Sequence, residues 1–352
     1  MLLDLFYEFA MPPWLARSEA QAYVDALEEI ELADRLGFHG VWLVEHHLMP
    51  GYSHLSKPDL VLAALARRTT RLRLGLGVIP LPYHHPLHVA ERIGTLDVLS
   101  GGRLEVGIGR GFSPNEYAAF GVAPADSRSR VEESLAILRG CATDAPLAHH
   151  GRHFQLDSLQ VLPRPLQHPY PPLWSAAVSP ETFEWAAREG LGVLAGPFKP
   201  WAMIAADLQR YRRAWRADQA PRIGMTVALL CLPERRRARA LAAPALRWSY
   251  SELLRVTAPV LEQLLPSYEH MHQLGRFRRL LKLGARLSLL ELAGLAIVGT
   301  PEECLERIER LHAAGVTHLL CSVGAGALPS EVVRESLQCI AREVLPKLAV
   351  AR

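Results

Sequence analysis

Residues 71–112 read RLRLGLGVIPLPYHHPLHVAERIGTLDVLSGGRLEVGIGRGF, and this stretch decides the fold class. Residues 71–79 and 103–109 are short apolar runs typical of buried strands, and residues 85–100 between them have the spacing of a helix. A strand, a helix and a second strand form a βαβ unit, in which the two strands run parallel. The stretch therefore predicts a parallel sheet covered by helices.

The same alternation continues along the whole chain. Further strands are predicted at 2–7, 40–44, 172–177, 191–195, 222–232 and 317–323, with helices at 18–36, 58–69, 127–139, 180–189, 200–216, 301–315 and 330–348. About eight such repeats predict one α/β domain over residues 1–352, folded as a (β/α)8 TIM barrel. A doubly wound open sheet is the alternative. It would usually carry a glycine-rich turn directly after the first strand, where this chain has EFAMP at 8–12.

Two segments interrupt the alternation. Residues 145–165 contain short extended pieces and prolines, which predicts an excursion with a β-hairpin. Residues 234–292 are rich in helix-forming and basic residues, including RFRRLLK at 276–282, and predict a helical insertion. Neither segment has the composition of a linker, so we expect a single domain.

Composition excludes several classes of protein. The net charge is 39 − 36 = +3, which gives no sign of the strongly basic face of a nucleic-acid-binding protein. The five cysteines are odd in number and widely spaced without a CxxC pair, which argues against a disulfide framework or a zinc site and favours a reducing cytoplasm. Since neither a signal peptide nor an apolar run of about 18 residues is found, we expect neither secretion nor membrane spanning.

The unusual residues cluster after the predicted strands. Glu45-His46-His47 follows the second strand, residues 77–82 end the third, GIGRGF at 107–112 ends the fourth, and residues 175–182 follow the fifth. The C-terminal strand ends of a (β/α)8 barrel share one face, which is where such barrels hold their active sites. We therefore expect these four segments to meet in space.

Glu45-His46-His47 is a candidate for proton transfer. Histidine exchanges a proton near neutral pH, and a neighbouring carboxylate such as Glu45 can fix its tautomer. Adjacent residues on an extended stretch point in opposite directions, so we expect one imidazole to face the cavity. The alternative is that both histidines only hold the loop by local hydrogen bonds. A metal site is not predicted, because the motif lacks the i, i+4 spacing of HExxH.

Several groups near the same face suit an anion. Arg110 lies among three glycines that permit close backbone approach, and its guanidinium is a planar fork for phosphate or carboxylate. Ser179 and Thr182 lie at a helix start, which caps the helix and can also bind phosphate. Arg128 lies at the start of another helix, where its positive charge opposes the helix dipole. Such a charge is expected where an anion binds nearby. Simple capping and an exposed arginine remain the alternative explanation.

Taken together, four stretches resemble the bacterial luciferase-like family of flavin-dependent monooxygenases: residues 41–47 (VWLVEHH), 74–112, 120–128 (FGVAPADSR) and 175–192 (SAAVSPETFEWAAREGLG). The resemblance covers roughly residues 1–200, with a weaker match at 296–320. It implies a (β/α)8 barrel, usually dimeric, that takes reduced FMN (FMNH2) from a separate flavin reductase and reacts it with dioxygen.

The resemblance also assigns expected roles to particular residues. It implies that His46 is the catalytic histidine, that Arg110, Arg128, Ser179 and Thr182 contact the flavin phosphate, and that a non-prolyl cis peptide between Gly77 and Val78 lies against the flavin ring. One departure is Gly109, which stands where light-emitting members carry a reactive cysteine. This argues against light emission and leaves monooxygenation open.

The leading hypothesis is therefore a cytoplasmic, homodimeric monooxygenase that uses reduced FMN and dioxygen on a small apolar or aromatic substrate. Tyr7, Phe9, Trp14, Tyr83 and the 234–292 insertion are expected to line the substrate pocket. A second hypothesis is an F420-dependent oxidoreductase that transfers hydride without oxygen. A third is a flavin-binding protein that is not an enzyme.

Overall fold

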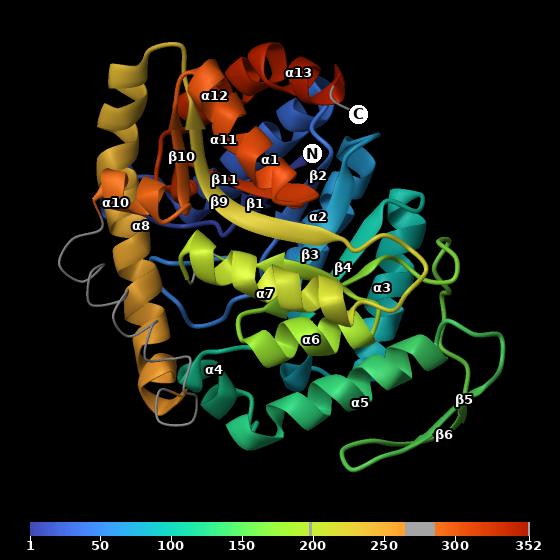
Figure 1. Cartoon of the computed structure of the whole chain (residues 1–352). Coiled ribbons are helices and arrows are strands. Elements are labelled where there is room, and N and C mark those ends of the chain that lie inside the picture. The colour runs from blue at the N-terminus through green and yellow to red at the C-terminus, as the bar shows by residue number, and fades with distance from the viewer. Residues whose placement is uncertain (197–198, 265–285, 351–352) are drawn as a thin grey trace.

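The computed structural model describes residues 1–196, 199–264 and 286–350, and a closed ring of eight parallel strands lies at the centre of these residues (Figure 1). In ring order the strands are β1 (Leu2–Tyr7), β2 (Gly40–Leu43), β3 (Arg73–Pro80), β4 (Leu104–Gly109), β7 (Leu173–Ala177), β8 (Gly192–Ala195), β9 (Ile223–Cys231) and β11 (His318–Val323). Pairing of β11 with β1 closes the ring. The predicted (β/α)8 barrel is confirmed, and the open sheet is excluded.

Helices cover the outside of the ring. The longer ones are α1 (Glu19–Leu36), α2 (Pro58–Arg68), α3 (Pro86–Ser100), α5 (Ser127–Gly140), α6 (Pro180–Arg188), α7 (Trp201–Ala214), α11 (Pro301–Ala313) and α12 (Ser330–Glu343), with the short α4 (Pro114–Ala119) and α13 (Leu345–Val350). Local residues set their ends. Ser18 caps α1 by accepting a hydrogen bond from the backbone N–H of Gln21 at 3.1 Å, and Gly37 ends it at φ +89°. In the described part of the chain, no helix is long and apolar enough to span a membrane.

Both predicted interruptions of the repeat are present. Strands β5 (Leu147–His150) and β6 (Gln155–Leu159) form an antiparallel hairpin between α5 and β7, and α8 (Arg235–Leu264) and α10 (Leu287–Leu292) make up the described part of the insertion. Figure 1 shows α8 as a long helix along one side of the barrel and the hairpin beside α5. The basic stretch 276–282 lies outside the described residues. The short strand β10 (Ala296–Gly299) pairs with β9 outside the ring.

Two tryptophans fill the interior of the barrel. Trp42 on β2 and Trp174 on β7 meet edge to face, with ring centroids 5.4 Å apart and an interplanar angle of 81°. Glycines on the neighbouring strands make this packing possible, because a Cβ on Gly75 would lie 2.4 Å from Cδ2 of Trp42 and one on Gly192 would lie 2.5 Å from Cε3 of Trp174. Together with Leu194 the two rings form a buried apolar cluster that closes the barrel below its C-terminal mouth.

Candidate active site

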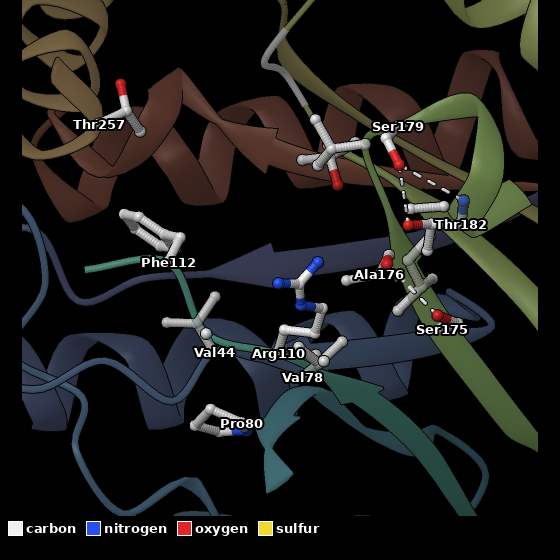
Figure 2. A pocket seen from close by; sticks show the side chains of 18 of the residues that line it. Val44, Val78, Pro80, Arg110, Phe112, Ser175, Ala176, Ser179, Thr182 and Thr257 are labelled. Atoms are coloured by element: carbon white, nitrogen blue, oxygen red, sulfur yellow. Dashed lines mark hydrogen bonds between the residues drawn. The ribbon is translucent and has the colours of Figure 1, made fainter. Parts of the chain in front are cut away.

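A cavity of about 910 Å³ lies at the C-terminal ends of the strands. Leu194 belongs both to the tryptophan cluster and to the cavity lining, so the cluster forms the cavity floor. All four strand-end segments singled out in the sequence contribute to the lining, as expected, and Figure 2 shows residues of three of them: 77–82, 107–112 and 175–182. The volume is at the upper end of the range of about 300–1,000 Å³ that is usual for ligand pockets. The cavity can therefore accept more than one small molecule.

Most of the predicted site residues line this cavity: Glu45, His46, Gly77, Val78, Arg110, Arg128, Ser179 and Thr182. Tyr7 and Tyr83, predicted as substrate contacts, lie outside its lining, as do Phe9 and Trp14. This corrects the prediction. The hydroxyl of Tyr7 donates to Glu29 at 2.8 Å, and that of Tyr83 donates to Glu116 at 3.3 Å. The physical reason for Tyr7 is strand alternation, which turns the neighbouring Phe6 and Glu8 to the cavity and Tyr7 away from it.

His46 faces the cavity, whereas His47 does not line it, as the alternation predicts. The imidazole of His46 packs edge to face on Phe112 and beside Tyr52, with ring centroids at 5.4 and 5.7 Å. Burial, with a smaller contribution from the charge of His47, lowers the pKa of His46 to about 4. The ring is therefore neutral at physiological pH and can both accept and donate a hydrogen bond.

Glu45 has a different set of partners from the one predicted. Its carboxylate accepts hydrogen bonds from His47 (3.2 Å) and His84, and it lies 3.4 Å from Nη1 of Arg92. Burial alone would raise the pKa of Glu45, but the hydrogen bonds from the two histidines outweigh it and hold the pKa at about 2. The carboxylate that pairs with His46 is instead Glu116, whose Oε1 lies 3.9 Å from Nδ1. Glu45 thus anchors the loop after β2.

Arg110 reaches into the cavity from the end of β4 (Figure 2). Its Nε and Nη2 donate to Oγ of Ser127 at 3.1 and 2.8 Å, and Tyr117 donates its hydroxyl to the Arg110 carbonyl at 2.7 Å. These bonds fix the guanidinium, while Nη1 has no acceptor among the described residues. An arginine held in this way is prepared to bind an anion in the cavity.

Ser179 and Thr182 form the opposite wall at the start of α6 (Figure 2). Ser179 is the N-cap, its Oγ accepts a hydrogen bond from the backbone N–H of Thr182 at 3.4 Å, and the two hydroxyl oxygens lie 3.1 Å apart. Arg128 lies at the start of α5 and pairs with Glu132 at 2.9 Å, half-exposed to solvent. The cavity thus has one end with two arginines, two hydroxyls and a helix N-terminus, a combination that favours an anion.

A flat apolar wall lies beside this polar end. The peptide bond between Gly77 and Val78 is cis, which confirms that expectation from the resemblance. Both residues line the cavity together with Gly109 on the neighbouring strand. A Cβ on Gly109 would lie 2.7 Å from Cγ2 of Val78, so no side chain fits at this position without displacing Val78. The wall can therefore be approached closely by a planar group.

The cavity also contains two residues that the sequence did not predict, Glu8 and Tyr52. The 234–292 insertion lines the cavity as expected, through one face of α8 that contributes Tyr250, Leu253, Leu254 and Thr257. The strand alternation that excludes Tyr7 would have pointed to Glu8. The spacing i, i+3, i+4, i+7 in α8 would have identified the face of the predicted insertion that meets the barrel. Tyr52 lies in a loop and has no comparable signal.

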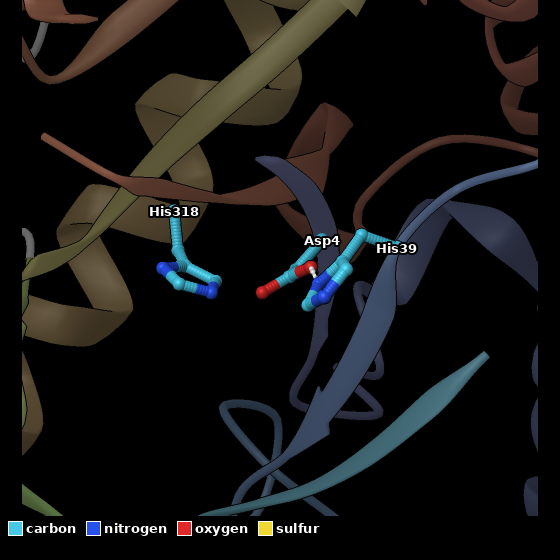
Figure 3. A group of neighbouring side chains, drawn as sticks. All are labelled: Asp4, His39 and His318. Atoms are coloured by element: carbon cyan, nitrogen blue, oxygen red, sulfur yellow. Dashed lines mark hydrogen bonds and ion pairs between the residues drawn. The ribbon is translucent and has the colours of Figure 1, made fainter. Parts of the chain in front are cut away.

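A second cluster of titratable groups lies toward the N-terminal ends of the strands, away from the cavity lining, and Figure 3 shows its three side chains. One ligand-type atom from each of Asp4, His39 and His318 lies within 4.8 Å of the others. Asp4 Oδ1 pairs with Nδ1 of His39 at 2.7 Å, and its Oδ2 accepts the indole N–H of Trp42 at 2.9 Å. Burial lowers the pKa of His318 to about 4. No sequence pattern pointed to this cluster, because Asp4 on β1, His39 just before β2 and His318 on β11 lie far apart along the chain. Both oxygens of Asp4 are already used in hydrogen bonds.

Comparison with known sequences places this geometry in context. A model of the luciferase-like monooxygenase family matches residues 3–318. The 4-hydroxyprotoasukamycin monooxygenase of Streptomyces nodosus subsp. asukaensis is 32% identical over 332 residues, which cover 91% of this chain and 85% of that protein. The oxygenase component of the flavin-dependent trigonelline monooxygenase of Acinetobacter baylyi is 33% identical over 183 residues, about half of each chain.

Solved structures share the whole fold. The monooxygenase RslO1 from Streptomyces bottropensis matches with a TM-score of 0.82 and 28% identity over 99% of this chain and all of that one. The oxygenating constituent of 3,6-diketocamphane monooxygenase from Pseudomonas putida, in complex with FMN, matches with a TM-score of 0.77 and 21% identity over 99% and 98%. The F420-dependent tetrahydromethanopterin reductase of Methanopyrus kandleri matches with a TM-score of 0.70 and 18% identity over 98% and 99%. At these identities, the last two comparisons establish the fold alone.

Proposed function

Because the chain belongs to the luciferase-like monooxygenase family, we propose that it is the oxygenase of a two-component system, which uses reduced FMN and dioxygen to oxidise a small apolar or aromatic molecule. The observation that carries the proposal is the convergence of three features in one cavity: an anion-binding end, a flat apolar wall, and a neutral imidazole. The family relatives that are named monooxygenases support the class of reaction.

The phosphate of FMN would occupy the polar end of the cavity. Nη1 of Arg110 is directed by the bonds of the guanidinium to Ser127, and the hydroxyls of Ser179 and Thr182 lie across from it. Arg128 supplies a second positive charge at the rim. A phosphate monoester carries up to about two negative charges near neutral pH, which the two arginines would balance. The donor set therefore fits the phosphate group.

The isoalloxazine ring would lie against the wall formed by Gly77, Val78 and Gly109, within reach of His46. When bound, reduced flavin supplies the electrons that activate dioxygen, which is chemistry the side chains cannot perform. The imidazole of His46 is neutral, since its pKa is about 4, and can donate or accept a hydrogen bond beside the ring. The apolar lining, including Phe112 and the α8 residue Leu253, keeps water away from the reacting atoms.

A separate flavin reductase would supply the FMNH2. The trigonelline relative supports this part of the proposal, since its name describes an oxygenase component. Assembly as a homodimer, and a cytoplasmic location, belong to the same proposal and rest on the family resemblance and on cysteine usage in the sequence.

Flavin titration of the purified protein tests the proposal. We expect tight binding of FMN and FMNH2, weaker binding of riboflavin, and oxygen consumption when a reductase and FMN are present. Arg110→Ala should weaken FMN binding by about 10–100-fold, because one charge-assisted hydrogen bond contributes about 1.5–3 kcal/mol. Riboflavin binding should change by less than about threefold.

Arg139→Ala is the matched control, since Arg139 lies on the same helix as Arg128 but pairs with Glu189 away from the cavity lining. Equal losses of FMN and riboflavin affinity in Arg110→Ala would reject the phosphate assignment. Binding of F420 in preference to FMN, with hydride transfer and no oxygen consumption, would replace the monooxygenase by the F420-dependent alternative. Binding of flavin without turnover on any substrate would support the non-catalytic alternative.

A further inference from the structure

Glu8 is an acidic side chain in the apolar part of the cavity. It follows β1 and lies on the same side of the strand as Phe6, so both residues line the cavity. The next residue, Phe9, is buried and has a positive φ of +54°, a conformation that costs a bulky residue about 1–2 kcal/mol. The chain thus turns sharply just after Glu8 and leaves its carboxyl group at the cavity wall.

Tyr52 holds one oxygen of this carboxyl. Its hydroxyl, on a side chain that is 5% exposed, donates to Oε1 of Glu8 at 2.6 Å. The hydroxyl of the nearby Tyr250 is already committed to the carbonyl of Leu295 at 3.1 Å. Among the described residues no group donates to Oε2, so this oxygen lacks a protein partner. Glu8 is partly exposed to the cavity that it lines, so a ligand that displaces water from this wall must supply a hydrogen bond to Oε2.

The surroundings of Glu8 define what such a ligand looks like. Phe6, Val44, Leu253, Leu254 and Leu320 line the same cavity and offer only apolar surface. Burial raises the pKa of Glu8 to about 7, against the opposing hydrogen bond from Tyr52. The carboxyl is therefore ionised only at and above neutral pH. A partner that donates a proton to Oε2 stabilises that ionised form, whereas an ether or hydrocarbon leaves it without compensation.

Glu29 provides an internal comparison. Glu29 is buried, whereas Glu8 is partly exposed to the cavity, but burial raises the pKa of Glu29 to about 7 as well, and Glu29 also accepts a tyrosine hydroxyl, from Tyr7 at 2.8 Å. Its second oxygen, however, accepts from Ser330 at 2.7 Å, and Glu29 does not line the cavity. Both oxygens of Glu29 thus accept hydrogen bonds from protein groups, whereas Glu8 faces the cavity and has one oxygen without a protein donor among the described residues.

We infer that Glu8, held by Tyr52, is the specificity-determining residue that accepts a hydrogen bond from a hydroxyl group on an otherwise apolar substrate. The inference rests on the proposed function, since it assigns the substrate end of the same cavity. It narrows the substrate class from any small apolar molecule to an apolar ring or chain that carries an alcohol or phenol. Glu8 positions that hydroxyl, and the carbon skeleton packs between β1 and the cavity-facing side of α8.

A pair of probes that differ in one proton tests the inference. Binding of 2-naphthol and of 2-methoxynaphthalene is measured by calorimetry at pH 8, where Glu8 has lost its proton, with and without FMN. The wild-type protein should bind 2-naphthol at least about tenfold more tightly, as expected for one hydrogen bond to a charged acceptor. In Glu8→Leu the preference should fall below about threefold. Glu8→Gln, which keeps the shape of the side chain, should also lose most of it.

Glu29→Gln is the matched control and should keep the full preference for 2-naphthol. Circular dichroism of each variant checks that it is folded, and Glu8→Gln decides the test if Glu8→Leu is not. A wild-type protein without the preference, or a preference that survives in both Glu8 variants, would overturn the inference. FMN titration of the same samples separates the two proposals: retained FMN binding without the hydroxyl preference rejects only the role of Glu8, while a wild type that binds no flavin rejects the proposed function.

Discussion

The two ends of the barrel contain the same kinds of side chains and use them in opposite ways. At the N-terminal ends of the strands, two buried carboxylates each receive an indole N–H: Asp4 from Trp42 at 2.9 Å and Glu105 from Trp174 at 2.7 Å. His39 pairs with the remaining oxygen of Asp4 at 2.7 Å, and Arg73 pairs with Glu105. Donors and acceptors thus neutralise one another within the protein.

At the C-terminal mouth the polar groups are only partly satisfied by protein. Nη1 of Arg110 and Oε2 of Glu8 have no partner among the described residues, and both side chains border the cavity. The comparison teaches that residue type alone does not identify a site here, since histidines and carboxylates occur at both ends. The C-terminal mouth differs because it has hydrogen-bonding atoms without a protein partner among the described residues, and these atoms lie next to a cavity.

The largest expected effect is on stability, at the N-terminal end. Trp174→Ala should lower the free energy of unfolding by about 3–5 kcal/mol, since it leaves a large void and deprives Glu105 of its donor. Trp174→Phe keeps most of the ring and should lose clearly less. Urea denaturation measures both. If Trp174→Ala were as stable as the wild type, the packing of Trp174 and its hydrogen bond to Glu105 would not stabilise the fold as proposed.

Gly109→Ala should have a smaller effect than Trp174→Ala, and this effect should be on flavin binding. Its Cβ would lie 2.7 Å from Cγ2 of Val78, so Val78, which lines the cavity, must shift, at a cost of about 1–3 kcal/mol. FMN and riboflavin should lose affinity equally, by about tenfold, because the flat wall and not the phosphate end is disturbed. The double variant Gly109→Ala/Val78→Ala removes the clashing methyl and should regain most of the affinity. Additive losses in the double variant would contradict this explanation.

Acid stability compares the two ends directly. His46 at the mouth and His318 at the opposite end both have a pKa of about 4, below the ordinary value of about 6.5, mainly because of burial. At a pH between about 4 and about 6.5, each of these histidines binds a proton in the unfolded chain but not in the folded protein. The free energy of unfolding therefore falls as the pH falls through this range. Each histidine should account for about 1 kcal/mol of the loss between pH 7 and pH 5.5.

His46→Gln and His318→Gln should each flatten this dependence by a similar amount when urea denaturation is repeated across that pH range. Oxygen consumption with FMN and a reductase should fall only in His46→Gln, since His318 lies at the far end of the barrel. If His318→Gln reduced oxygen consumption as much as His46→Gln does, the division of labour between the two ends would be wrong.

Sequence periodicity predicted the fold more completely than it predicted the site. The βαβ pattern of residues 71–112 and the short apolar runs elsewhere identify the strands, because buried parallel strands are apolar over their whole length. The position of Arg110 and Ser179 at strand ends was enough to bring them into one cavity. The orientation of side chains was harder to predict. The sequence predicts Tyr7 in the pocket, whereas the structure turns Glu8 beside it to the cavity.

Partner choice among charged groups could not be predicted either. Glu45 is adjacent to His46 in sequence, yet its carboxylate bonds to His47 and to His84, which lies 39 positions away. Glu116, the carboxylate beside His46, sits in the short helix α4, which the sequence did not predict. Such pairings depend on where loops from different strands come together, and local sequence patterns carry no information about that.

The smallest expected effect separates capping from binding at a single residue. Ser179→Ala removes the N-cap of α6, and Ser18→Ala removes the equivalent cap of α1 on an exposed surface. Each should cost about 0.5–1 kcal/mol of stability, as measured by urea denaturation. Only Ser179→Ala should also weaken FMN binding, by about threefold to tenfold, because a hydroxyl that caps a helix and contacts a phosphate loses both roles. If the two variants bound FMN equally well, Ser179 would act only as a helix cap, and the phosphate would be bound by Arg110 and Arg128 without it.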